Sequence, residues 1–71
     1  MVSPITSITE RVLAALKDDP RTQDAMVEVA FNQGVVTLAG VVKTAEARDA
    51  AEEISRQQAG VVTVINELKV V

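Results

Sequence analysis

The sequence predicts a small α+β domain with elements in the order helix, strand, strand, helix, strand, and both helices on one face of a three-stranded mixed sheet. Three observations predict this fold class. The longest nearly uninterrupted apolar run, 34–42, is rich in β-branched residues, which is typical of a central strand. Apolar residues recur at helical spacing in 5–16 and again in 47–54. The five residues that begin at Gly34 and at Gly60 are nearly alike, which indicates two strands with the same facing.

The composition indicates one domain, residues 1–71, with a core of aliphatic side chains. A chain of this length is near the lower limit for a single core, so we expect a stability of only a few kcal/mol. Cysteine and histidine are both absent, so neither a disulfide nor a zinc site is expected. Phe31 is the only aromatic residue although 48% of the chain is hydrophobic, and aliphatic packing must therefore supply the core.

The charge pattern narrows the choice of partners. The formal net charge is −3, and the seven Lys and Arg residues are spread singly along the chain. With no basic stripe and no aromatic platform for bases, nucleic-acid binding is not expected. The same acidity argues against purely electrostatic attachment to an anionic lipid surface.

No targeting or membrane-spanning segment is expected. The first seven residues lack the charged start and apolar segment of a signal peptide. No apolar run approaches the roughly 20 residues that span a bilayer. As given, the chain is expected to be soluble; a module cut from a longer secreted or anchored protein is the alternative. The residues leave its compartment open.

Two signals compete for the start of the first helix. Ser3-Pro4 offers an N-cap serine with proline at the first helical position, whereas the segment from Ser7 to Glu10 offers a capping box one turn later. The helix should end at Asp18-Asp19-Pro20, because the residue before a proline is disfavoured in the α region. Its apolar stripe consists of Ile5, Ile8, Val12, Leu13 and Leu16.

A hairpin is expected next. The segment from Met26 to Phe31 alternates as a strand does, with Val27, Val29 and Phe31 on one face. Asn32-Gln33-Gly34 tolerates positive φ and predicts a tight turn, so the first two strands should be antiparallel. Gly40 indicates either a β-bulge or the close approach of another backbone, for which the second helix is the candidate.

The second helix should begin after Thr44 as its N-cap, with Glu46 in the first turn, and end at Gly60 as its C-cap glycine. Arg48, Glu52 and Arg56 lie four residues apart and should form an exposed charge ladder. The narrow apolar face consists of Ala47, Ala50, Ala51 and Ile54, whose small side chains allow close packing on the sheet.

The last strand is expected to run from Val61 to Val71, parallel to the second strand after a right-handed crossover. The inward-facing residues of these two strands are expected to be Val36, Leu38, Val62, Val64, Leu68 and Val70.

These residues resemble the BON domain over essentially the whole chain. The combination of Gly-Val-Val-Thr-Leu-x-Gly-x-Val, from Gly34, with Gly-Val-x-x-Val-x-Asn-x-Leu, from Gly60, is fairly specific, although each piece alone is weak. The other matching segments are Val12-Leu13-Ala14-Ala15-Leu16 followed by Asp19-Pro20, then Val27-Glu28-Val29, then Ala50-Ala51-Glu52-Glu53-Ile54, and finally Val70.

The resemblance implies the helix-strand-strand-helix-strand fold and a non-catalytic binding module, without a cofactor, of bacterial envelope and osmotic-stress proteins. It implies contact with a phospholipid membrane or a membrane-proximal protein in the periplasm, with tandem pairing of domains or a homo-oligomer as further expectations. The alternative is a self-associating or regulatory domain of a larger protein, in the periplasm or the cytoplasm, without lipid binding.

The residues of the family motif favour structural roles. Gly34, Gly40 and Gly60 are expected to serve turn geometry, close packing and helix termination rather than ligand contact. Asn66 lies on the inward face, where a buried amide needs partners, and is expected to tie down a loop or the end of the first helix. Ligand contact is the other interpretation of Asn66.

No catalytic or metal-binding residues are expected. Asp18, Asp19 and Asp24 form a small acidic cluster, but their spacing matches no EF-hand loop and predicts solvated carboxylates. No serine has a histidine to activate it, and no phosphate-cradling motif occurs. Enzyme activity is therefore not expected.

The side of the sheet without helices is the candidate interaction face. It should be largely apolar and centred on Val35, Ala39, Val41 and Ile65. Because a contiguous exposed apolar patch usually marks an interaction site, we hypothesise that it binds a second copy, a tandem neighbour or a lipid surface. The alternative is a solvated sheet face that tolerates its valines.

Overall fold

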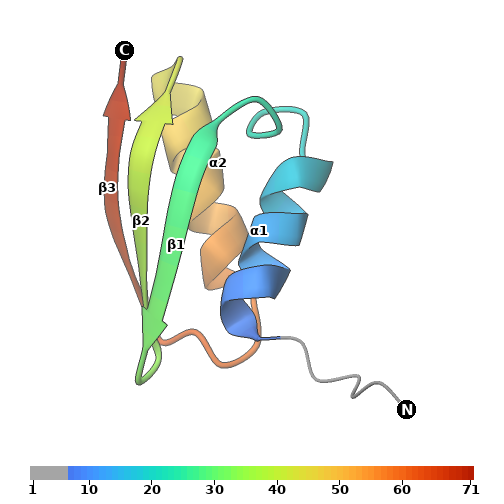
Figure 1. The fold of residues 1–71 in the computed structure, drawn as a ribbon, viewed down its shortest axis with the longest axis vertical. Helices are drawn as coiled ribbons and strands as arrows, with labels where there is room; N and C mark the ends of the chain where they lie inside the picture. Colours follow the sequence, from blue (N-terminus) through green and yellow to red (C-terminus); the bar gives the residue numbers. More distant parts are fainter. Residues whose placement is uncertain (1–6) are drawn as a thin grey trace.

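A computed structural model of the chain describes residues 7–71, and it has the predicted order of elements. The elements are α1 (Ile8–Asp18), β1 (Met26–Asn32), β2 (Val35–Val42), α2 (Ala45–Arg56) and β3 (Thr63–Val70). The strand order in the sheet is β1-β2-β3, with β1 antiparallel and β3 parallel to β2. Both helices lie on one side of the sheet (Figure 1). The predicted fold class is confirmed.

The start of α1 follows the second of the two sequence signals. Ser7 is the N-cap, and the Glu10 backbone N–H donates to its Oγ at 3.1 Å while the Ser7 backbone N–H donates to the Glu10 carboxylate at 3.3 Å. The alternative start at Ser3-Pro4, and Ile5 of the predicted stripe, lie outside the described residues. The helix ends at Asp18, as the following Asp19-Pro20 predicts.

The connection after α1 holds a buried polar contact that the sequence did not indicate. Thr22 is 2% exposed, and its hydroxyl donates to the carbonyl oxygen of Leu16 in the last turn of α1. This bond satisfies one of the carbonyl groups that a helix end leaves without an intrahelical partner. The connection after α1 therefore helps to close the helix.

The predicted hairpin between β1 and β2 is confirmed, but its turn consists of two residues and not three, because Asn32 is the last residue of β1. Asn32 pairs with Val35, and the two turn residues, Gln33 and Gly34, have φ values of 50° and 85°. Positive φ at both central positions is the geometry whose twist matches the flanking strands. Phe31 shares a face with Val27 and Val29 but is 38% exposed at the hairpin end of β1, so it contributes less to the core than its position predicts.

Gly40 marks a close approach of two backbones, as predicted, but its neighbour is β1 and not the second helix. Its φ is 129°, and a Cβ at this position would overlap the carbonyl oxygen of Met26. The pairing of Val27 with Gly40 and of Met26 with Val41 continues without an extra residue. The predictions of a bulge and of a contact with the second helix were therefore wrong, because the register of the hairpin places the backbone of β1 next to Gly40.

The helix α2 begins as predicted and ends earlier. The hydroxyl of Thr44 accepts from the backbone N–H of Ala47 at 3.0 Å, which caps the first turn. Its C-cap is Gln57 in the right-handed region, whereas Gly60, with φ 93°, lies in the connection to β3. The predicted C-cap role of Gly60 was wrong: its positive φ turns the loop instead.

The charge ladder on α2 forms only in part. Arg56 pairs with Glu52 at 2.5 Å, but Arg48 pairs with its neighbour Asp49 at 3.3 Å rather than with Glu52. These pairs are exposed and contribute little to stability.

The last strand begins at Thr63 and not at Val61, which corrects both its length and its inward set. The backbone N–H of Val61 donates to the carbonyl of Gln58 in a turn, and this turn places Val61 against the core. Val62 is consequently 81% exposed, and Val70, near the end of the strand, is 43% exposed. Val64 and Leu68 pack inward as predicted.

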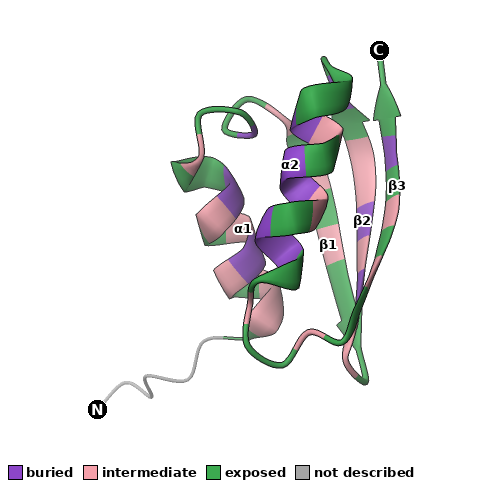
Figure 2. Ribbon diagram, turned by 180° about the vertical axis from the view of Figure 1, so that it is seen from behind, coloured by how far each residue is buried: buried purple, intermediate pink, exposed green. Residues whose placement is uncertain are grey.

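The core lies between the helices and the centre of the sheet, where the small side chains of α2 allow a close approach. Figure 2 shows the buried residues along the sides of α1 and α2 that face each other. The buried hydrophobic cluster consists of Val12, Leu16, Val36, Leu38, Val42, Ala47, Ala51, Ile54 and Leu68.

Candidate functional site

The register of the sheet defines the face that no helix covers, called here the open sheet face. Four rows of side chains cross it from β1 to β3. They are Met26, Val41 and Lys69; Glu28, Ala39 and Glu67; Ala30, Thr37 and Ile65; and Asn32, Val35 and Thr63.

The candidate residues predicted from the sequence all lie on this face, but they are not equally exposed. Val41 is 40% and Ile65 is 44% exposed, whereas Val35 and Ala39 are half-buried. Val35, Ala39 and Val41 follow one another along β2, and Ile65 lies beside Thr37 on the neighbouring strand. The residues therefore share one face without forming one compact patch.

A row of carboxylates divides the open sheet face. Glu28 of β1 and Glu67 of β3 are both exposed, and both are register neighbours of Ala39 on the central strand. Only the half-buried Ala39 lies between them, so the apolar surface narrows at this row to one small side chain. One apolar region remains at the end with Met26 and Val41, and a second remains toward the hairpin with Val35 and Ile65.

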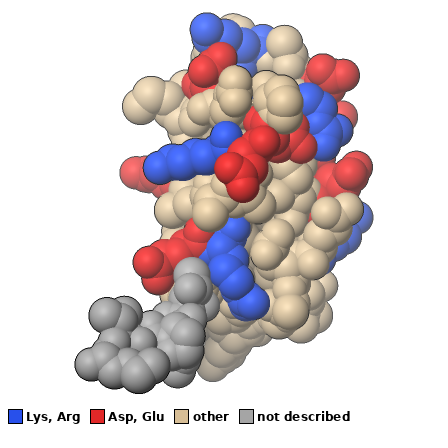
Figure 3. Space-filling view, turned by 90° about the vertical axis from the view of Figure 1, so that its right-hand side faces the viewer, with Lys and Arg blue, Asp and Glu red and all other residues tan. Residues whose placement is uncertain are grey.

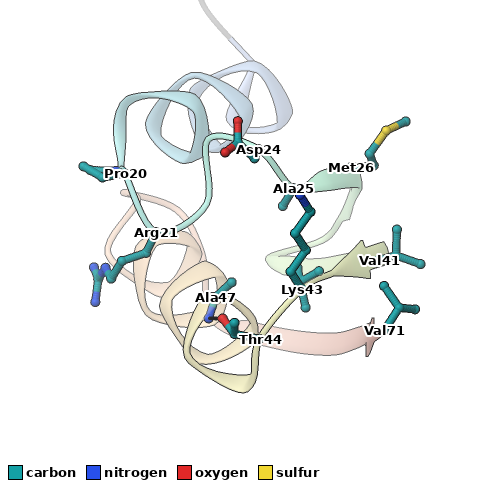
Figure 4. A pocket seen from close by; sticks show the side chains of 11 residues that line it. Pro20, Arg21, Asp24, Ala25, Met26, Val41, Lys43, Thr44, Ala47 and Val71 are labelled. Carbon is teal, nitrogen blue, oxygen red and sulfur yellow. Dashed lines mark hydrogen bonds between the residues drawn. The ribbon is translucent and has the colours of Figure 1, made fainter.

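The first region adjoins a cavity of about 240 Å³, called here the strand-end pocket. It lies where the connection after α1 meets the ends of β1 and β2 and the start of α2. In Figure 4, Lys43 extends across the pocket, Arg21 and Asp24 point away from it, and Met26, Val41 and Val71 gather on one side. The residues that line the pocket are Pro20, Arg21, Asp24, Ala25, Met26, Val41, Val42, Lys43, Thr44, Ala47 and Val71.

The strand end combines exposed apolar side chains with lysines. Met26 is 74% exposed, and Lys69 lies beside Val41 in the register. Met26, Val41, Lys43 and Lys69 are together called the strand-end surface below. On the face of the molecule that carries α1, by contrast, basic and acidic side chains alternate (Figure 3). The strand-end surface thus offers apolar contact next to positive charge.

Asn66 has the structural role expected of it, but with different partners. Its Nδ2 donates to the carbonyl of Arg48 at 3.0 Å and to the Glu52 carboxylate at 3.4 Å, both on α2. Its Oδ1 accepts from the backbone N–H of Leu68 at 3.1 Å. The amide therefore ties β3 to α2 and not to a loop or to the end of the first helix, because α2 is the helix that packs on β3.

In the acidic cluster after α1, Asp19 is paired with Arg21 and is not simply solvated as predicted. Arg21 donates to the Asp19 carboxylate from its guanidinium at 2.8 and 3.1 Å and from its backbone N–H at 2.8 Å. These bonds, the guanidinium ones foremost, lower the pKa of Asp19 to about 2, because each of them stabilises the ionised carboxylate. Within residues 7–71, no three potential metal ligands come together.

The strand-end pocket was missed by the sequence analysis. Its residues come from 20–26, 41–47 and position 71, so no single stretch of sequence carries its pattern. The only local signal is Lys43, a single charge between an apolar strand and the cap of a helix.

In the part of the chain that the structure describes, neither helix is long and apolar enough to cross a membrane.

Comparison with known proteins gives one family. Residues 5–71 match the profile of the BON domain, and a comparison with curated proteins found no match. The profile covers the described elements from α1 to β3. The BON domains are a family of envelope-associated, non-catalytic, phospholipid-binding modules, and this chain belongs to that family.

Proposed function

We propose that this chain is a non-catalytic binding module of the bacterial cell envelope that contacts phospholipid through its strand-end surface. The observation that supports this assignment is the coincidence of exposed Met26 and Val41 with Lys43 and Lys69 beside the strand-end pocket. The periplasm is the compartment that the family favours.

The chemistry of the strand-end surface suits a lipid headgroup region. Apolar side chains gain free energy when they leave water for the acyl boundary, at about 25 cal/mol per Å² of buried apolar area. Lysines keep their ammonium groups at the level of the phosphates while their aliphatic stems lie along apolar surface. Each basic residue close to an anionic membrane contributes about 1 kcal/mol.

The carboxylate row sets the orientation of the proposed contact. Glu28 and Glu67 lie one row behind Met26, Val41 and Lys69, so a bilayer that meets the whole open sheet face would meet both carboxylates. A domain that approaches with its strand end first keeps the two carboxylates in water. We therefore place the lipid at the end of the sheet and not across its middle.

Reversing the charge of Lys43 tests this assignment. We expect Lys43→Glu to weaken binding to vesicles of anionic phospholipid roughly tenfold or more, since two units of charge change next to the membrane. The measurement is co-sedimentation with vesicles over a range of lipid concentrations. Arg56→Glu is the matched control, because it makes the same charge change at the opposite end of α2 (Figure 1). Equal losses in the two variants, or none in either, would contradict the assignment.

A second candidate function, protein assembly, is favoured by the hairpin end of the same face. Ile65 is 44% exposed there, and a hollow of about 320 Å³ is lined by Ala30, Phe31, Asn32, Gln33, Val35 and Thr37. This region lies on the far side of the carboxylate row from the lysines, so it suits an apolar protein surface such as a tandem neighbour. The partner at this region can equally be a second copy of the chain, which would give a homo-oligomer.

Ile65→Asp tests the assembly candidate. We expect a wild-type chain that associates reversibly in sedimentation velocity and an Ile65→Asp chain that stays monomeric, because the carboxylate would be buried without a partner. Val71→Asp is the control, because Val71 is 77% exposed and follows β3 at the opposite end of the sheet, on the other side of the carboxylate row. This candidate would be removed if the wild-type chain is strictly monomeric and the Ile65→Asp chain binds every partner of the wild-type chain with unchanged affinity.

A further inference from the structure

The outer edge of β3 is an unpaired strand edge whose geometry can be read from its bonds to β2. The backbone N–H groups of Thr63 and Val71 donate to carbonyls of Gly34 and Val42, at 3.1 and 2.9 Å. In a parallel ladder, the backbone groups of every second residue of a strand bond to the same neighbouring strand. The N–H and C=O groups of the odd-numbered residues of β3 therefore point toward β2. The backbone groups of the even-numbered residues, Val64 to Val70, consequently point to the outer edge.

Asn66 covers the middle of this edge. Its Oδ1 accepts from the N–H of Leu68, one of the outward-pointing donors. Its Nδ2 is held by the Arg48 carbonyl at 3.0 Å and by the Glu52 carboxylate at 3.4 Å. The amide is thus fixed from the helix side while it occupies a donor that an incoming strand would need. Proteins block exposed edges because such edges are templates for pairing with other chains.

The charges of β3 identify the strand that would fit its edge. Two copies of the chain can pair their β3 strands antiparallel about a two-fold axis, with the helices of both copies on the same side of the joined sheet. In such a pair, an odd-numbered residue lies opposite an odd-numbered residue of the second copy, and an even-numbered residue opposite an even-numbered one. With Leu68 at the two-fold axis, Glu67 lies opposite Lys69 of the second copy, and the reverse pair forms as well. An axis at Glu67 or at Lys69 would place like charges directly opposite, which is destabilising. An axis at Ile65 or Asn66 leaves both charges without a counter-charge.

The register that the charges select is the one that Asn66 blocks. With the axis at Leu68, the N–H of Leu68 must donate to the Leu68 carbonyl of the second copy. In the structure that N–H already donates to Asn66. We propose that the outer edge of β3 is a docking edge for a second copy of this chain and that Asn66 keeps it closed. The docking edge is the backbone edge of β3; of the strand-end surface it involves only Lys69, and the pairing does not require lipid.

Removing the Asn66 amide tests the proposal. Asn66→Val keeps a strand-forming residue and frees the N–H of Leu68, so its average mass in sedimentation equilibrium should exceed that of the wild-type chain at the same concentration. Thr63→Val adds a similar apolar group to the other face of the same strand and should stay at the mass of the wild-type chain. An Asn66→Val chain that remains folded by circular dichroism and is no heavier than the wild-type chain would overturn the proposal.

Charge variants identify the register. In the Asn66→Val background, Glu67→Lys should abolish the dimer because lysines would face lysines, and adding Lys69→Glu should restore it. A dimer that ignores both changes does not use this edge in this register and would also overturn the proposal. Hydrogen exchange on the wild-type chain provides a test without substitution. The Leu68 amide should exchange more slowly than the amides of Val64 and Val70, and equal rates would contradict the closed edge.

Discussion

Gly40→Ala is expected to unfold the chain under ordinary conditions. The added Cβ would overlap the Met26 carbonyl oxygen, which is backbone of the paired strand and has no rotamer through which to move away. The φ of 129° adds strain for any residue with a Cβ. A domain of this size has about 3–5 kcal/mol of stability, and opening the β1–β2 pair would consume most of it. Circular dichroism and a thermal melt are sufficient to measure the loss.

Gly34→Ala is the control for this prediction. Its φ is 85°, and a Cβ there would lie 2.9 Å from a methyl group and 3.3 Å from the Cβ of Val62, an exposed side chain in the connection to β3 and not the backbone of a paired strand. We expect a loss of about 1–2 kcal/mol, the cost of a left-handed residue, with the fold retained. A Gly40→Ala chain that melts at the wild-type temperature would contradict the strand contact described above.

Leu38→Ala is expected to lower the free energy of unfolding by about 2–5 kcal/mol, the range for deleting a fully buried leucine side chain. Leu38 is 0% exposed on the central strand and belongs to the cluster that joins the sheet to both helices. Urea unfolding measures the change, and a variant that is already unfolded without urea corresponds to the upper end of this range. Val41→Ala, on the same strand but 40% exposed, should cost less than about 1 kcal/mol. Similar losses in the two variants would mean that the core does not lie on the helix side of β2.

Local signals in the sequence were enough wherever the structure depends on near neighbours. The capping box at Ser7, the turn at Gln33-Gly34 and the cap at Thr44 each involve residues within three positions of one another. Such features are decided by backbone conformation and short hydrogen bonds, and the structure has all three. The competing start at Ser3-Pro4 used equally local signals and lies outside the described residues.

The errors arose where a residue acts through a distant partner. Gly40 was expected to be special, but its neighbour Met26 depends on the hairpin register, and the α2 partners of Asn66 depend on how that helix lies on β3. Gly60 has the positive φ of a C-cap glycine, yet α2 ends at Arg56 and Gly60 lies in the loop that follows. The sequence did not distinguish the two roles, because a positive φ is needed in a turn as well as at a helix end. The sequence pattern indicates which conformations and bonds a residue can adopt, but it does not identify its distant partners in the fold.

The candidate interaction face was predicted in outline and not in detail. Alternation along the strands identified the open sheet face, because the side-chain period of a strand is fixed. The division of that face by Glu28 and Glu67 follows from the register between strands, and the strand-end pocket follows from three separate segments. Both features change the proposed contact from the middle of the face to its end.

The most direct test of the proposed lipid contact is an amide-resolved NMR titration of the chain with bicelles that contain anionic phospholipid. We predict that shifts or line broadening will concentrate at Met26, Val41, Lys43 and Lys69, with the hairpin end of the sheet unaffected. No change at high lipid, or changes confined to the outer faces of α1 and α2, would contradict binding through the strand-end surface.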